Sequence, residues 1–312
     1  MKEQRFLTYH DQIALLKQQG MTVSDEKAAA EILAEVGYYE LVNGYKRIFK
    51  DPRTGKYRPG VTFEELYALY KCDENLRQLF FKYMLRIEIH MRSILSYAFC
   101  EQFGERQQAY LNRDNYDTEG DCAHEVSRLI GELDYAANRA DKAVYVRHHR
   151  NTYHNVPLWV LFKTLSLGTL NRFLRCCRQD IRIYAARQFP DLRENTLCRM
   201  LDVMQDFRNV CAHNDCLYTY KSEGSIPVMP VLRSVAVPAF REGRPYEGRD
   251  LFALMVVFRY LLDENDYSRA SDAVERILAH FSAQCASVDS DEVLAAMGFP
   301  PDWRNLGVPQ KR

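Results

Sequence analysis

The sequence lacks an excess of charge of either sign, and it holds few residues that interrupt regular structure. Lys plus Arg and Asp plus Glu both number 42 among 312 residues, so the formal net charge is zero. A protein that coats nucleic acid through its overall charge is therefore not expected, and any contact with RNA or DNA must come from a local patch. Glycine (14) and proline (11) are also few, which argues against collagen-like, linker-rich and disordered chains.

Long hydrophobic runs and a secretion signal are missing as well. The longest apolar runs, such as 251–258 and 156–162, are far too short to span a bilayer, and the N-terminal MKEQRFLTYHDQ lacks an apolar core. The nine cysteines are irregularly spaced and lack the paired C-x2-C framework of a zinc site. We therefore expect a cytoplasmic, reduced protein with no membrane partner, no metal and no cofactor.

Helical periodicity is the strongest positive signal. Thr62 and Glu65 are spaced as a capping box, and apolar residues then recur every three or four positions from Leu66 to Ala98, with no Pro or Gly before Gly104. This spacing is typical of a buried helix face, so we expect this helix to be the spine of the fold. Other helices are expected at 27–36 (capped by Ser24), 120–139, 158–175, 180–188, from 193 into 207–215, and at 248–262, 268–284 and 289–297, with a connector at 141–157.

These elements predict an all-α protein, a multi-helix bundle with one proline-rich excursion at 218–248 that forms a long loop or a short β-hairpin. Residues 1–60 are expected to form a helical and extended segment packed on the core. Residues 61–288 are expected to form the helical domain, and residues 289–312 a short helix and a tail. A loop as long as 218–248 in a compact domain is usually functional or mobile.

The stretch RNVCAHN at 208–214 holds the candidate chemistry. Arg208 and His213 are five positions apart, so on a regular helix their side chains point about 140° apart. Asn209 and His213 share one stripe of the helix, where the amide could fix the imidazole tautomer by a hydrogen bond. For Arg208 to join them, the helix must end near Ala212, or a second subunit must supply the missing partner.

These residue types suit the cleavage of RNA without a metal. Histidine titrates near neutral pH and can act as the base on a ribose 2′-OH or as the acid on the leaving 5′ oxygen. A guanidinium can hold the phosphoryl oxygens in a bidentate fork, and the products would be a 2′,3′-cyclic phosphate and a 5′-OH. The alternative is structural, since an Arg and a His at this spacing occur by chance in many helical proteins. His213 would then be a satisfied helix-end residue and Arg208 a solvated charge.

A second basic feature precedes the motif. It consists of four arginines, which on one helix would fall within about 120° of arc. Such a stripe could hold a phosphate backbone or be a solvated helix face. We predict RNA contacts for Asn214, beside His213, and for this stripe, which consists of Arg172, Arg175, Arg178 and Arg182.

The motif and its context resemble a known family. RNVCAHND-x-LY at 208–218 resembles the RN-x-CAH signature of bacterial abortive-infection proteins of the AbiD/AbiF type, which belong to the HEPN superfamily of helical ribonucleases. Other similar blocks follow in the family's order, namely GYYELVNGYKRIF at 37–49, TFEELYALYKCDENLRQLFFKYMLRIEIHMRS at 62–93, VPLWVLFKTLSLGTLNRF at 156–173 and GFPPDW at 298–303.

The resemblance implies a HEPN-type helical fold and a metal-independent endoribonuclease that acts in phage defence as a growth-arresting toxin. Arg208 and His213 take the catalytic places, near a dimer interface, and Asn209 takes the polar position after the arginine. The implied partners are the RNA substrate, a second copy in a homodimer, and an RNA or protein antitoxin. The chain departs from many members at Lys163, where they carry Glu, and at Cys216, where they carry a basic residue. Non-catalytic alternatives are an RNA- or protein-binding HEPN module and a helical scaffold in a defence complex.

Overall fold

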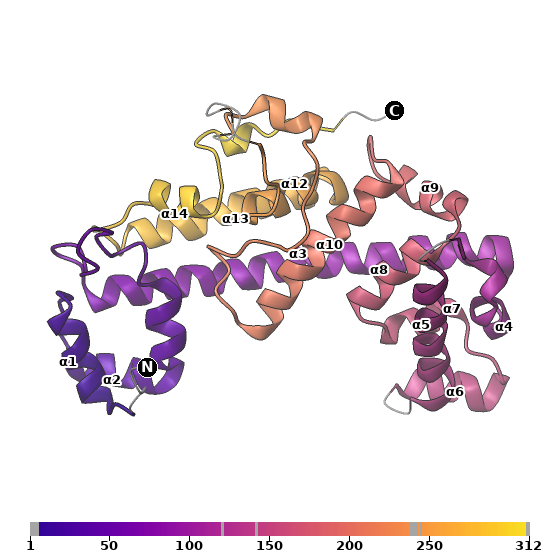
Figure 1. Cartoon of the computed structure of the whole chain (residues 1–312), viewed down its shortest axis with the longest axis horizontal. Coiled ribbons are helices and arrows are strands. Elements are labelled where there is room, and N and C mark those ends of the chain that lie inside the picture. The colour runs from indigo at the N-terminus through magenta and orange to yellow at the C-terminus, as the bar shows by residue number, and fades with distance from the viewer. Residues whose placement is uncertain (1–5, 120–121, 141–142, 238–242, 244, 310–312) are drawn as a thin grey trace.

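Helices are the regular elements of this protein (Figure 1). The computed structural model describes residues 6–119, 122–140, 143–237, 243 and 245–309, and these ranges contain three isolated β-bridges and no strand. The predicted all-α class is therefore confirmed. The described part of the 218–248 excursion is a loop with one 3-10 turn, η5 (Pro230–Ser234), rather than a hairpin.

Helix α3 (Phe63–Phe103) runs the length of the molecule (Figure 1) and confirms the predicted spine. Its 41 residues correspond to about 60 Å. The Thr62 hydroxyl accepts from the Glu65 N–H at 3.2 Å, and the Glu65 carboxylate accepts from the Thr62 N–H at 3.0 Å, which is the predicted capping box. Gly104, with φ of 85°, ends the helix in a conformation that glycine adopts without strain.

Glu65 also fastens the C-terminal part of the chain to the start of α3. One carboxylate oxygen accepts from the N–H groups of Ala286 at 2.7 Å and Ser287 at 2.9 Å, and the other accepts from the Ser287 hydroxyl at 2.8 Å. Burial acts to raise the pKa of Glu65, but these bonds and the Thr62 N–H outweigh it, so the pKa lies below its ordinary value.

Replacing Glu65 by glutamine is expected to lower the free energy of unfolding by about 1–3 kcal/mol at pH 7, because a buried acceptor of four bonds loses its charge and one oxygen. Because the folded-state pKa is depressed, the carboxylate stabilises the fold above its unfolded pKa, and this stabilisation is lost as the pH falls through the folded value. Urea unfolding of wild type and Glu65→Gln should therefore converge on acidification. A difference that is the same at pH 7 and pH 3 would contradict this account.

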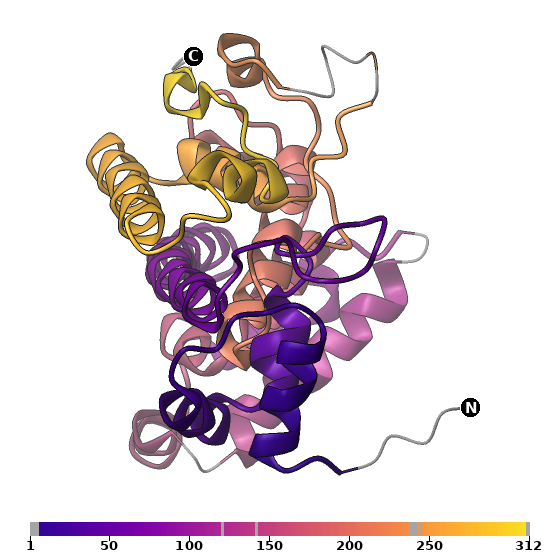
Figure 2. The same ribbon diagram turned by 90° about the vertical axis from the view of Figure 1, so that its left-hand side faces the viewer.

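The remaining helices gather at the two ends and along one side of α3 (Figures 1 and 2). Helices α1 (Tyr9–Gln18) and α2 (Glu26–Val36) lie at one end, followed by the π-helical turn η1 (Tyr39–Asn43). The other end carries α4 (Gln107–Leu111), η2 (Arg113–Asn115), α5 (Cys122–Asp134), η3 (Tyr135–Arg139), α6 (Val144–Tyr153), α7 (Leu158–Leu161) and η4 (Phe162–Thr164). The chain continues through α8 (Leu167–Cys176), α9 (Gln179–Arg187), α10 (Glu194–His213), α12 (Leu251–Leu261), α13 (Glu264–Ser282), α14 (Ser290–Ala296) and η6 (Trp303–Asn305).

Several local predictions were wrong. Helix α1 was not expected, and α2 is capped by Asp25, which accepts from the Ala28 N–H at 2.9 Å, rather than by Ser24. The connector predicted at 141–157 contains α6, which buries only Val146 and so lacks a clear apolar face. The single helix predicted at 158–175 is divided into α7, η4 and α8, because Ser166 adopts a cap conformation and starts α8 afresh.

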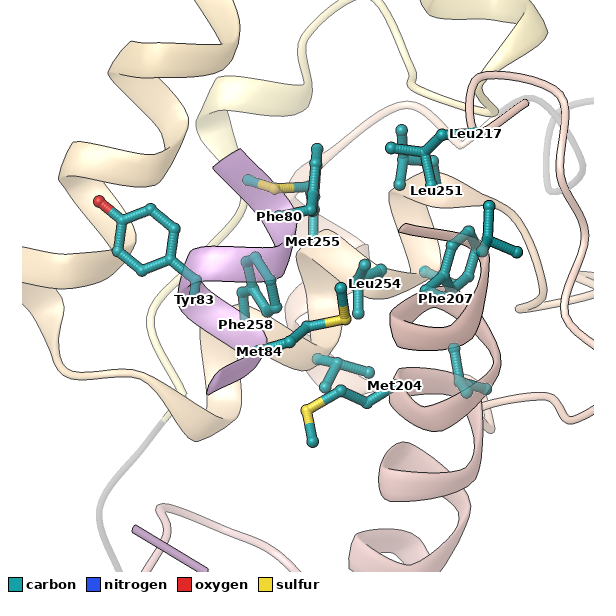
Figure 3. Packing of buried hydrophobic residues seen from close by; sticks show 14 of the residues in the cluster. Phe80, Tyr83, Met84, Met204, Phe207, Leu217, Leu251, Leu254, Met255 and Phe258 are labelled. Atoms are coloured by element: carbon teal, nitrogen blue, oxygen red, sulfur yellow. The ribbon is translucent and has the colours of Figure 1, made fainter. Parts of the chain in front are cut away.

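Helix α12 forms the centre of the core. All eleven of its residues are buried, as expected for a helix that is apolar on every side. Figure 3 shows Phe258 against α3, where its ring lies 5.5 Å from that of Phe80, and Leu254 facing Met204 and Phe207 of α10. Helix α10 is therefore held to the spine through α12 as well as by direct contact, while α13 packs along α3.

Candidate functional site

The motif residues lie at the C-terminal end of α10. The helix continues through His213, and Asn214 ends it in the left-handed conformation, with φ of 62° and its N–H bonded to the Val210 carbonyl. Arg208 and His213 both lie within the regular helix, so within one chain their side chains leave the axis about 140° apart. The helix does not end near Ala212, so an early helix end does not bring Arg208 and His213 together, and a second subunit is the arrangement that is left.

The polar side chains of the motif differ in their exposure. Asn209, His213 and Asn214 are exposed, whereas Arg208 is half-buried with its guanidinium 5.8 Å from the ring centroid of Phe81. The Arg208 Nε is buried without a hydrogen-bond partner. Within the described ranges no hydrogen bond or ion pair joins Arg208, Asn209 and His213 to one another, so the expected bond from Asn209 to the imidazole is not present.

A buried ion pair holds the chain segment that follows the motif. Asp73 and Arg77 of α3 have side chains 0% and 3% exposed, and Arg77 Nη1 donates to Asp73 at 2.6 Å. The same carboxylate accepts from the Tyr45 hydroxyl at 2.6 Å and from the N–H groups of Leu217 at 2.9 Å and Tyr218 at 2.8 Å. One carboxylate of the spine therefore joins the N-terminal segment to the residues directly after the motif.

Sequence reasoning missed this network, although a signal for it exists. Asp73 and Arg77 are four positions apart, and they interrupt the apolar stripe of α3 between Leu69 and Phe80. A charged pair at that spacing on a buried face indicates an internal ion pair. Burying charges costs free energy that the pairing only partly offsets. The network is therefore better explained by its holding of Leu217 and Tyr218 against α3 than by a gain in stability.

A second carboxylate that was missed ties the proline-rich excursion to the motif helix. Asp206 of α10 accepts from the Ser222 hydroxyl at 2.7 Å and from the N–H groups of Glu223 at 3.0 Å and Gly224 at 3.3 Å. Asp206 lies two residues before Arg208, so the excursion begins against the helix that carries the motif.

The four arginines of the predicted stripe do not lie on one helix. Arg172 and Arg175 belong to α8, Arg178 directly precedes α9, and Arg182 lies within α9. Helix α8 ends at Cys176, and the extended Cys177 and Arg178 separate the two helices. The assumed common arc is therefore wrong, because it required one continuous helix.

Each of these arginines also has an acceptor within the chain: Arg172 pairs with Glu125 and Glu132, Arg175 with Asp202 and Arg182 with Asp117, while Arg178 donates to the Asp114 carbonyl. Partly exposed ion pairs of this kind contribute only about 0–1 kcal/mol each, so a phosphate could displace some of them. Their contact with RNA stays a prediction.

Two hollows help to place the site along α10. One of about 260 Å³ lies between α8 and α10, with Arg172, Arg175 and Gln205 in its lining. Gln205, Asn209 and His213 are spaced by four, so one stripe of α10 runs about 12 Å from this hollow to the motif. A second hollow, of about 810 Å³, is lined by residues of the α9–α10 connection between 183 and 194 and by no motif residue.

Other chemistries find little support at the motif. Burial raises the pKa of the Cys211 thiol to about 12, so this thiol is protonated and a poor nucleophile at neutral pH. The described residues contain no cluster of three or more His, Cys, Asp or Glu side chains arranged for a metal ion.

Among the helices in the described ranges, none combines the length and apolar composition that a bilayer-spanning segment needs.

The fold and the site define an all-helical protein with a half-buried Arg208 and an exposed Asn209 and His213 near the end of its motif helix. The family model of Abi-like proteins matches residues 31–219, which is more than half of the chain and extends from α2 to just beyond the motif. The chain therefore belongs to the Abi-like proteins, an abortive-infection family. No curated protein and no solved structure matches it significantly.

Proposed function

We propose that this chain is a phage-defence effector that cleaves RNA without a metal, as an AbiD/AbiF-like endoribonuclease of HEPN type. The observation that carries the proposal is the RNVCAHN string, which lies at an exposed helix end inside the region matched by the family model. The exposure of Asn209 and His213 supports it, because both groups are accessible to a polymeric substrate.

The chemistry needs a base, an acid and a cation around one ribose phosphate. A neutral His213 imidazole takes the proton of the 2′-OH, the 2′ oxygen bonds to phosphorus, and the bond from phosphorus to the 5′ oxygen breaks. A protonated imidazole gives its proton to the departing 5′ oxygen. Arg208 binds the phosphoryl oxygens, where negative charge develops in the transition state, and Asn209 orients the substrate beside His213.

A homodimer would supply two imidazoles and bring together side chains that diverge within one chain. An apolar stripe on α3 supports this arrangement. Phe81, which lies under Arg208, is followed at intervals of four by Leu85 and Ile89, which are 37% and 64% exposed. A symmetric contact through this stripe would place two motif helices on either side of one cleft.

Replacing Ile89 by glutamate is expected to raise the dimer dissociation constant at least roughly tenfold, because a charge would enter the apolar contact. Light scattering coupled to size exclusion measures this change, and RNA cleavage should fall with the loss of dimer. Val144→Glu is the matched control, since Val144 is 67% exposed and lies on α6. A wild-type chain that is monomeric yet cleaves RNA would contradict the dimer.

The proposal is tested by incubating the purified full chain with total RNA in EDTA and determining the chemistry of the new ends. We expect 5′-OH and 2′,3′-cyclic phosphate ends, which sequencing methods selective for each end detect. Intact RNA, or products that carry a 5′-phosphate, would contradict the mechanism.

One observation favours a second function, a non-catalytic RNA-binding module. Within one chain Arg208 points away from the stripe that carries Asn209 and His213, and in the described residues no hydrogen bond or ion pair joins the three side chains. RNA binding by wild type without any cleaved product would favour this module over the nuclease.

A further inference from the structure

A pocket of about 240 Å³ lies between the N-terminal segment and the residues that directly follow His213. One wall is the N-terminal segment, with the π-helical turn η1 (Tyr39–Asn43). The opposite wall is formed by residues 214–216, which directly follow His213, and Tyr70 of α3 also lines the pocket. The lining of the pocket therefore begins one residue after His213, at the end of the motif helix.

The aromatic lining suits a flat ligand. Tyr39 is 74% exposed, so its ring is open to a ligand, while Tyr70 and Tyr45 are buried with their ring centroids 5.6 Å apart. Proteins that read single-stranded RNA stack splayed bases on exposed aromatic side chains of this kind. Single turns of π-helix, such as the one that carries Tyr39, are also frequent at functional sites.

The polar lining suits a base rather than a phosphate. Glu40 and Asp215 bring two carboxylates to the pocket, which repel a phosphate and accept hydrogen bonds from N–H groups. Asn43 and Asn214 add amides, which can both donate and accept. Guanine presents a ring N–H and an amino group on one edge, whereas uracil presents a single ring N–H, and adenine and cytosine each present an amino group beside a ring nitrogen that only accepts. Two carboxylates therefore favour guanine among the four bases.

The walls of the pocket are joined by the buried network described above. Arg77 donates to the Tyr45 hydroxyl at 2.9 Å and to the Asp215 carbonyl at 3.4 Å, and its guanidinium lies 5.7 Å from the Tyr70 ring centroid. The Cys216 thiol donates to the Gly44 carbonyl at 3.5 Å. Contacts to both walls hold the pocket in place before any ligand arrives, which lowers the entropy lost on binding. The Asp73–Arg77 pair therefore holds the two walls of the pocket together, which accounts for a buried ion pair that is costly to desolvate.

We propose that this pocket binds the nucleobase adjacent to the cleaved phosphate and selects guanine. The proposal rests on the RNA-cleaving function above and assigns its base specificity. Tyr39 stacks on the base, and Glu40 and Asp215 accept from its donor edge. Neither carboxylate takes part in the bond-breaking step, so changes in the pocket alter the choice of site rather than the chemistry.

The first experiment maps cleavage sites by sequencing 5′-OH ends from RNA treated with the full-length chain. Wild type should show guanine enriched at one nucleotide flanking the cut. Tyr39→Ala should lower cleavage at guanine sites roughly 10- to 100-fold, the range expected for one lost stacking contact, and Glu40→Gln should reduce the preference for guanine. Tyr97→Ala is the matched control, because Tyr97 is 56% exposed on α3 and lies outside the pocket. Thermal melting confirms that each variant is folded.

The second experiment measures binding without cleavage. Guanosine and uridine monophosphates are titrated by NMR into the full-length His213→Ala chain and into a chain that also carries Tyr39→Ala. We expect guanosine monophosphate to bind at least roughly tenfold more tightly than uridine monophosphate, and this difference to disappear with Tyr39→Ala.

The outcomes separate the two proposals. If wild type cleaves RNA but its base preference is absent, or is the same in Tyr39→Ala and Glu40→Gln, the pocket assignment is overturned and the nuclease stands. If wild type cleaves no RNA, the nuclease falls, and the titration alone decides the pocket. Equal or absent binding of the two nucleotides overturns the pocket assignment, and it is the result expected of a pocket that takes a protein segment. A Tyr39-dependent preference for guanosine monophosphate supports the assignment.

Discussion

Replacing His213 by alanine is expected to reduce RNA cleavage by at least about 10²- to 10⁴-fold, because the reaction loses its proton acceptor and donor. We also expect expression of the wild type to arrest growth, and this arrest should disappear with the cleavage. His213 is exposed at the end of α10, so the melting temperature should be unchanged. The measurements are the cleavage rate on a defined RNA and the growth of expressing cells.

Two further variants sharpen this test. His124→Ala removes another exposed imidazole, on α5, and should leave cleavage unchanged. Arg208→Lys keeps the charge but not the bidentate fork and should lose most of the cleavage. Equal cleavage and equal toxicity in wild type and His213→Ala would remove the basis for the nuclease proposal.

Replacing Asp73 by alanine is expected to lower the free energy of unfolding by about 3–5 kcal/mol, because Arg77 would be left buried without its counter-charge. The N–H groups of Leu217 and Tyr218 would also lose their acceptor. The loss should therefore extend to function, since the segment after the motif would no longer be fixed to α3. Urea unfolding at pH 7 measures the first effect and RNA cleavage the second.

The double variant Asp73→Leu with Arg77→Met provides the control for this prediction. It removes both charges, so its destabilisation should be smaller than the sum of the destabilisations caused by Asp73→Leu alone and Arg77→Met alone. Additive effects would show that the pair is not energetically coupled and would contradict the network as the link between the spine and the motif.

Local chemistry made much of the fold predictable. The capping box at Thr62 and Glu65 and the stop at Gly104 gave both ends of α3, because the signals that start and end a helix lie within a few residues of each terminus. The break between α7 and α8 was missed for a related reason. Ser166 satisfies a cap as readily as an exposed helical position, and only the packing of Leu165 and Leu167 on either side decides between them.

The candidate site was predictable only in part. Arg208, Asn209 and His213 are adjacent in sequence and stand out as a string, although their roles stay predictions. The carboxylates that hold the surrounding chain were not found, because Asp73 meets Leu217 across 144 positions. Periodicity carries no information on contacts of that range. The pocket beside Tyr39 was missed for the same reason.

The sequence by itself determined the helical class, the position of the spine and the motif string, because helix periodicity, caps and residue chemistry are local properties. Only the tertiary structure decided that the four arginines divide between two helices and that Asp73 joins Tyr45 to the chain after His213. Such contacts depend on how whole helices pack, and packing is set by the shapes of many distant side chains at once.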